Sequence, residues 1–201
     1  MAPPDSGTDT CLWTWSALAM GFALLAAGVP GSSLGLFGLL ADVAEQKGVP
    51  WWVAGAMAGA ATVMGHGASY LFFAHLGQPV LSALSTKIPH VGVAVHRLRL
   101  LLAQDRPLLP LLALRWVGLG YTQVFWLLAT AGIGRPAWLG LLFLNDWLWA
   151  LIWTYVAAGL VRTVPGAGEW LVPGAAALVA FSLVAGVWGV VRHLRRSGGA
   201  P

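Results

Sequence analysis

Arg115 lies within a long apolar run, Pro107 to Gly134, where a charged side chain is unexpected. A charge in hydrocarbon is costly, so an ionisable residue at this depth predicts a functional site. The planar guanidinium binds two phosphate oxygens at once and stays protonated at neutral pH. Tyr121 and Gln123, in the same run, are neutral groups able to complete a polar pocket. We therefore expect Arg115 to hold the phosphate of a lipid headgroup.

Asp146 is a second charged residue within an apolar run, near the middle of Leu139 to Trp153. We expect it to be the counter-ion of Arg115, because pairing lowers the cost of burying both charges. A role as a titratable coupling group stays open. The alternatives for Arg115 are a permanent pair with Asp146, or a side chain that extends to the membrane interface. The tryptophans around this run, Trp147 and Trp149 among them, are expected to serve packing and anchoring.

His66 falls in the apolar segment Trp51 to about Gly77. No second ligand stands at metal spacing, so we expect a hydrogen-bonded packing residue and neither a metal nor another cofactor. Cys11 is the only cysteine, which excludes an intramolecular disulfide. An intramembrane hydrolase needs a nucleophile beside a base, for which Ser69, His66 and Asp146 are candidates. No Gly-x-Ser-x-Gly or His-Glu-x-x-His motif supports catalysis, and we predict that the protein is not an enzyme.

Composition predicts an integral membrane protein. Of the residues, 58% are hydrophobic and 9% charged, with 12 Trp, 26 Gly and a mean hydropathy of +0.76. The N-terminal ten residues contain no Lys or Arg and so lack the basic region of a cleaved signal sequence. The formal net charge is +4, but the basic residues flank apolar segments. Membrane lipids, and not nucleic acid, are therefore the expected partners.

The first apolar segment, Leu12 to Leu40, is interrupted between Ala27 and Ser33. Pro30 removes a backbone donor there, and neighbouring glycines loosen the same turn. Each arm is shorter than the ~20 residues that a full membrane span needs. A helical hairpin that enters and leaves on one side is predicted, with a single kinked helix as the alternative.

A full span, Trp51 to about Gly77, is predicted after a polar connection, Ala41 to Pro50. Gly55 and Gly59 give this span a small-residue face for close packing against a neighbouring helix. Lys87 to Arg106 has the composition of a basic amphipathic helix in the membrane interface, with a loop that has a solvated basic face as the alternative. The positive-inside rule makes the segment cytoplasmic in either case.

The C-terminus carries Arg192, Arg195 and Arg196 and should be cytoplasmic as well. If Pro136 to Val161 and about Glu169 to Val191 both span, they form an out-and-back pair. Pro107 to Gly134 then starts and ends on one side, which predicts a re-entrant hairpin that turns at Gly118-Leu119-Gly120. The alternative is a tilted span.

These elements predict an all-α integral membrane fold. It contains two oppositely oriented re-entrant helical hairpins, three transmembrane helices and a basic interfacial helix. A hairpin followed by a span, twice and in opposite orientation, is the pattern of an inverted repeat with a site near mid-membrane. We expect one membrane domain, 12–194, with an N-terminal tail, 1–11, and a basic C-terminal tail, 195–201.

The chain resembles the DedA membrane proteins, also called the VTT or SNARE-associated family, from about Gly28 to Gly159. Val29-Pro30-Gly31-Ser32 is similar to the family's Pro-Gly-acid turn. Gly65-His66-x-x-x-Tyr70 is similar to its Gly-Asp-x-x-x-Tyr, and Arg115-Trp116 with Gly118 and Tyr121 stands in place of its Arg-Phe-x-Pro-x-x-Arg. Three residues of the family's pattern differ in this chain. Ser32 stands in place of the acid of the turn, His66 in place of the aspartate of the span, and Tyr121 in place of the second arginine.

The resemblance implies a protein of the bacterial inner membrane, multi-pass, that moves polyprenyl phosphate or phospholipid across the bilayer. The missing carboxylates put ion coupling in doubt. A non-transporting membrane scaffold is the alternative, and the oligomeric state is open, a homo-oligomer included. The residues expected to bind the lipid headgroup are Arg115, Tyr121, Gln123, Ser32, Gly31, Pro30 and Gly118, with Asp146 and His66 as charge partners or coupling groups.

Overall fold

The computed structural model describes residues 6–29, 32–87, 108–117, 121–130 and 136–164, with eight isolated positions between 100 and 184. This part of the chain is helical throughout and contains no strand, so the all-α prediction is confirmed for it. The helices are α1 (Ser6–Ala27), α2 (Ser33–Gln46), α3 (Trp51–Lys87), α5 (Leu108–Val117), α6 (Tyr121–Thr130) and α7 (Pro136–Thr163).

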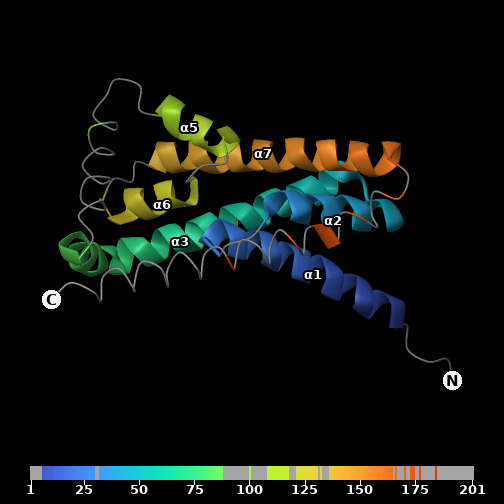
Figure 1. The fold of residues 1–201 in the computed structure, drawn as a ribbon, viewed down its shortest axis with the longest axis horizontal. Coiled ribbons are helices and arrows are strands. Elements are labelled where there is room, and N and C mark those ends of the chain that lie inside the picture. The colour runs from blue at the N-terminus through green and yellow to red at the C-terminus, as the bar shows by residue number, and fades with distance from the viewer. Residues whose placement is uncertain are drawn as a thin grey trace.

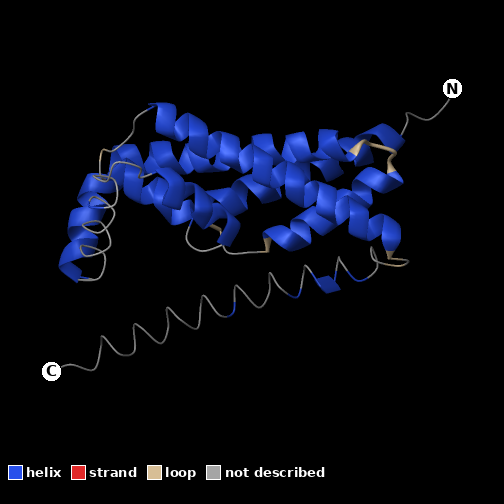
Figure 2. Cartoon of the chain, turned by 90° about the horizontal axis from the view of Figure 1, so that it is seen from above, coloured by secondary structure: helices blue, strands red, loops and turns tan. Residues whose placement is uncertain are grey.

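The two long helices, α3 and α7, run side by side in opposite directions along the molecule (Figure 1). The α1–α2 pair approaches the middle from one end, and the α5–α6 pair approaches it from the other end (Figure 1). Seen from above, the described helices again form an elongated bundle (Figure 2). Because α3 packs against α1, α6 and α7, it connects both pairs to α7.

The first predicted break is confirmed, since α1 ends at Ala27 and α2 begins at Ser33. Gly28 has a positive φ of 105° and ends α1, with Val29 N–H donating to the Leu24 carbonyl at 3.0 Å. This is the left-handed cap that glycine favours. Ser32 caps α2, because its hydroxyl accepts a 3.2 Å hydrogen bond from the Gly35 N–H. The alternative of a single kinked helix is wrong.

The second predicted break is also confirmed. α5 ends at Val117 and α6 begins at Tyr121. The predicted turn, Gly118-Leu119-Gly120, falls between them and lies outside the described residues. Each of these helices has 10 residues. At about 1.5 Å per residue, each is only half the length that crosses a bilayer.

Three helices extend beyond their predicted limits. α2 continues through Ala41 to Gln46, where a polar connection was predicted, because Ala41 and Ala44 are buried in the core. α3 continues past Gly77 to Lys87 despite Pro79 in its interior, and Figure 1 shows this green end turning out of line. α1 begins at Ser6, ahead of the apolar run. The predicted interfacial helix after Lys87 and the last predicted span lie almost entirely outside the described residues.

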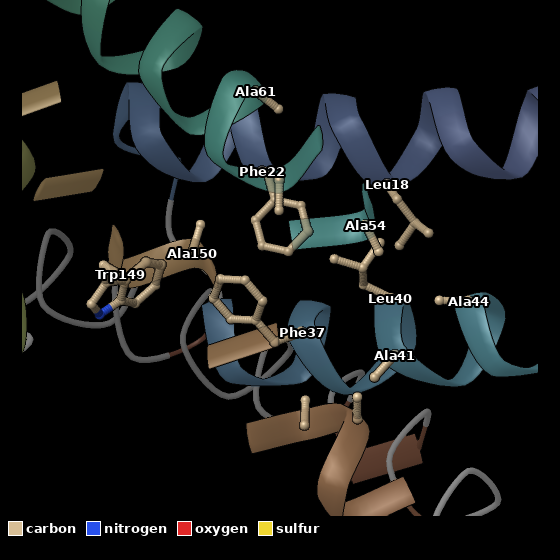
Figure 3. Packing of buried hydrophobic residues seen from close by; sticks show 13 residues of the cluster. Leu18, Phe22, Phe37, Leu40, Ala41, Ala44, Ala54, Ala61, Trp149 and Ala150 are labelled. Carbon is tan, nitrogen blue, oxygen red and sulfur yellow. The ribbon is translucent and has the colours of Figure 1, made fainter. Parts of the chain in front are cut away.

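The core joins the first pair of helices to the middle of α7. Phe37 of α2 contacts Phe22 of α1 and Trp149 of α7, with ring centroids 4.8 and 5.0 Å away (Figure 3). Gly55 and Gly59 form the expected small-residue face: a methyl group on either would come within 3.4 Å of an α7 backbone Cα. α7 therefore has a fixed position against both α2 and α3.

Only α7, among the residues that the structure describes, is by length and composition apolar and long enough to cross a membrane. It spans Pro136–Thr163, with 28 residues, and the predicted span from Pro136 to Val161 lies within it.

Candidate functional site

Arg115, in the last turn of α5, meets Asp146, at the middle of α7. Arg115 Nε lies 3.1 Å from Asp146 Oδ1, and the two side chains are 12% and 0% exposed. Neither atom makes a geometrically aligned hydrogen bond, so the contact is an ion pair. The expected counter-ion contact is therefore present. Arg115 does not extend to an outer surface, contrary to one of the alternatives.

The indole ring of Trp149 packs against the guanidinium of Arg115. Arg115 Cζ stands 3.6 Å from the centroid of the Trp149 ring and 5.1 Å from that of Tyr121. A cation over an aromatic face is attracted by the ring quadrupole. From the sequence, Trp149 was expected to serve packing and anchoring, and its contact with Arg115 was not predicted. A signal was present, because residues three apart on a helix share a face and Trp149 follows Asp146 by three.

His66 of α3 is completely buried and bonds on both ring nitrogens. Its Nδ1 lies 2.8 Å from Asp146 Oδ2, and its Nε2 lies 3.3 Å from the hydroxyl oxygen of Thr122 in α6. Its ring stacks on Phe125, with centroids 4.4 Å apart. The prediction of a hydrogen-bonded histidine is confirmed. No cluster of three metal-ligating side chains occurs among the described residues.

A neutral ring satisfies both histidine contacts. A proton on Nδ1 donates to the Asp146 carboxylate, and the free Nε2 then accepts the Thr122 hydroxyl hydrogen. The charges of Arg115 and Asp146 cancel in this arrangement. A buried group with no net charge avoids most of the desolvation cost that a lone ion would impose.

Further hydrogen bonds tie the α5–α6 pair to α7. The Asn145 amide donates to the Leu112 carbonyl and accepts from Trp116 Nε1, both at 3.1 Å. The Tyr121 hydroxyl donates to the Leu142 carbonyl, also at 3.1 Å. Tyr121 was expected to offer a polar group to a ligand, but its hydroxyl is used within the fold and its ring faces Arg115. The site is thus held by several independent contacts.

A cavity of about 340 Å³ lies between the two helix pairs. Arg115, Thr122 and Gln123 line it from one pair, and Val29 and Ser33 from the other, so the two turns meet as expected from the sequence. Pro30, Gly31 and Gly118 lie outside the described residues, and the Ser32 hydroxyl serves as a helix cap. The remaining lining residues are Phe22, Leu25, Ala26, Gly28, Thr62 and Trp149.

Comparisons with protein-family models, with curated protein sequences and with solved structures found no match to this chain.

Proposed function

We propose that this chain is a multi-pass membrane protein whose central cavity binds the phosphate group of a lipid and carries it between the leaflets. The observation that carries the proposal is Arg115, a buried guanidinium that lines a cavity between two oppositely directed helix pairs. Arginine recognises phosphate through its planar fork of donors. The resemblance of the motifs to DedA proteins agrees with the proposal.

The distribution of side chains supports a membrane location. Large apolar residues are exposed along the long helices, among them Met64 and Phe72 on α3 and Leu144 and Tyr155 on α7. Asp146 and His66, in contrast, are fully buried. A chain with apolar residues outside and ionisable residues inside is suited to a lipid environment. α7 supplies one span on length and composition.

The two helix pairs support transport. Because they come from opposite ends and stop near the middle (Figure 1), each is proposed to be a re-entrant hairpin that opens to one side of the bilayer. Two broken-helix elements in opposite orientation are typical of transporters that bind their substrate near mid-membrane. α7 is then one full span, and the proposal takes α3 and the sequence from about Glu169 to Val191 as the other two.

The ion pair engages Nε of Arg115, which lies 3.1 Å from Asp146 Oδ1. The proposal assigns the two terminal nitrogens of the guanidinium to the phosphate. A phosphate in the cavity would accept from these nitrogens while Asp146 stays in place. The Trp149 ring, 3.6 Å from Arg115 Cζ, contacts the guanidinium and so helps to position it.

A lipid flip assay in proteoliposomes tests the proposal. The probes are a fluorescent phospholipid and a fluorescent polyprenyl phosphate, added to vesicles with and without the protein. Wild type is expected to move at least one of them, and Arg115→Ala to slow it about tenfold or more, because a hydrogen bond to a charged group contributes about 1.5–3 kcal/mol. Arg115→Lys keeps the charge but loses the fork and should be intermediate.

Arg162→Ala is the matched control, since Arg162 is an exposed arginine that pairs with Glu45 far from the cavity. It should flip lipid as wild type does. Wild-type vesicles no faster than empty ones would favour the scaffold alternative, in which the Arg115–Asp146 pair only holds α5 against α7.

A further inference from the structure

We propose that Thr122 is a nucleophile and that the cavity hydrolyses the phosphate ester or anhydride of a lipid. The structure places Asp146, His66 and Thr122 in series, with the last opening into the cavity that Arg115 lines. The inference rests on the proposed binding of a lipid phosphate in this cavity. It adds a chemical step that transport alone does not need.

The three groups follow the order carboxylate, imidazole, hydroxyl, which is the order that activates a hydroxyl as a nucleophile. The carboxylate lies 2.8 Å from Nδ1 of the imidazole, and the hydroxyl lies 3.3 Å from Nε2. In this order the acid orients the ring and stabilises its protonated form, while Nε2 takes the proton of the nucleophile. The three residues come from three helices, α7, α3 and α6, so only the folded chain assembles them.

The imidazole is held in one orientation. Its ring stacks on Phe125 at 4.4 Å and meets the Tyr121 ring edge-on at 5.5 Å. His66 and Asp146 are both 0% exposed, so water does not compete for their contact. A base that is already oriented loses little freedom when the reaction begins.

The position of Thr122 suits attack on phosphorus. Thr122 and Arg115 line the same cavity, so a phosphate held by the guanidinium is near the hydroxyl. The transition state of phosphoryl transfer spreads negative charge over the outer oxygens, which a fixed guanidinium stabilises. Thr122 is also the second residue of α6, where backbone N–H groups have no acceptor within the helix.

The reaction balances with water as the co-reactant. The Thr122 oxygen bonds to phosphorus while its proton passes to His66 Nε2. The bond from phosphorus to the lipid oxygen breaks, and that oxygen leaves with the proton from His66. Water then attacks the phosphothreonine, gives a proton to His66, and Thr122 regains it as the oxygen–phosphorus bond breaks. The products are inorganic phosphate and the lipid less one phosphoryl group, which is an alcohol from a monoester and a monophosphate from a diphosphate.

The other hydroxyl considered from the sequence does not fit this role. Ser69 lies on α3 with His66, but its hydroxyl donates to the Ala27 carbonyl at 3.1 Å. Thr154 is buried in α7 and donates to the Ala150 carbonyl of its own helix at 2.8 Å. The Thr122 hydroxyl, in contrast, contacts the His66 imidazole.

Phosphate release by the purified full chain in detergent tests the inference. The probes are farnesyl diphosphate, a lipid anhydride, and dioleoyl phosphatidate, a lipid monoester. Wild type is expected to release phosphate from at least one. Thr122→Val, which keeps the shape, should lower turnover about a thousandfold or more, as loss of a nucleophile does. Thr122→Ser should retain turnover within about tenfold, and Thr154→Val should match wild type.

Acid-quenched intact-protein mass spectrometry supplies a second readout. A phosphoryl adduct on Thr122 is expected during turnover and absent in Thr122→Val. No phosphate release by folded wild type from either probe would overturn the inference, and so would unchanged turnover in Thr122→Val. Lipid flip without phosphate release leaves the transport proposal intact, whereas phosphate release without flip overturns transport and supports hydrolysis.

Discussion

At the scale of residues, one buried carboxylate organises the site. Asp146 pairs with Arg115 through Oδ1 and with His66 through Oδ2, and Trp149 lies one turn further along the same helix. Its charge is matched only while Arg115 is present. The stability of the fold should therefore depend strongly on the arginine.

Arg115→Ala is expected to lower the free energy of unfolding by about 3–5 kcal/mol, because removing one partner of a buried pair leaves the other charge uncompensated. Arg162→Ala should cost less than about 1 kcal/mol, since the side chains of Arg162 and Glu45 are 55% and 46% exposed. Thermal unfolding in detergent measures both variants. Equal losses of unfolding free energy in the two variants would show that the buried pair of Arg115 stabilises the fold no more than the exposed pair of Arg162 does.

Asp146→Asn in the Arg115→Ala background should recover part of that loss. The neutral amide removes the unpaired charge and keeps the shape. A double variant less stable than Arg115→Ala would mean that Asp146 is held by contacts other than its charge. Thermal unfolding in detergent, applied to the single and the double variant, distinguishes these two outcomes.

At the scale of elements, α3 is the helix against which the others are placed. Its glycines let neighbouring helices approach: a methyl group on Gly65 would clash with the Ala23 carbonyl oxygen of α1, and one on Gly77 would clash with the Thr130 side chain of α6. α1 and α6 both line the cavity. The close contacts at Gly65 and Gly77 therefore determine how near α1 and α6 lie to α3, and with that the width of the cavity.

Gly65→Ala is expected to destabilise the fold by about 1–3 kcal/mol, as overpacking a tight contact does. It should also displace α1 and slow lipid movement. Gly140→Ala is the control, because nothing lies within 4 Å of a methyl group there. Alanine in a helix is favoured over glycine, so this variant should be neutral or more stable by up to about 1 kcal/mol. A tolerated Gly65→Ala would contradict the tight α1–α3 contact.

At the scale of the whole molecule, the α1–α2 pair and the α5–α6 pair lie at opposite ends (Figure 1). The end of α2, the start of α3 and the end of α7 gather at one end, where Glu45 pairs with Arg162 at 2.8 Å. The start of α7 lies at the other end (Figure 1). If the long axis crosses the bilayer, positions at these two ends face opposite compartments.

Single-cysteine labelling in a Cys11→Ser background tests this orientation. Lys47→Cys and Val164→Cys, both at exposed positions, should react with an impermeant thiol reagent from the same side of sealed vesicles. Ala137→Cys, exposed near the start of α7, should react only from the opposite side. Labelling of all three from one side would contradict the proposed transmembrane arrangement.

The helix breaks and the contact between Arg115 and Asp146 were predictable from the sequence. Gly and Pro interrupt helices through local backbone geometry, and two opposite charges in apolar runs lower their cost by meeting. The lengths of α2 and α3 were not predictable, because burial of Ala44 and the packing of Gly77 come from neighbouring helices. From local composition, the polar residues of these segments indicate a connection, and the burial that makes them helical cannot be seen.

For the residues that the structure describes, the sequence alone determined helices with two interruptions and a charged pair, because periodicity, glycine and charge act over short distances. Only the tertiary structure decided that His66 stands between Asp146 and Thr122, and that Trp149 lies beneath Arg115. Those contacts join residues from separate helices, so they depend on how α3, α6 and α7 pack. Hydroxyl, imidazole and carboxylate become a chemical unit only within about 3 Å of one another, a distance that packing and not sequence spacing determines.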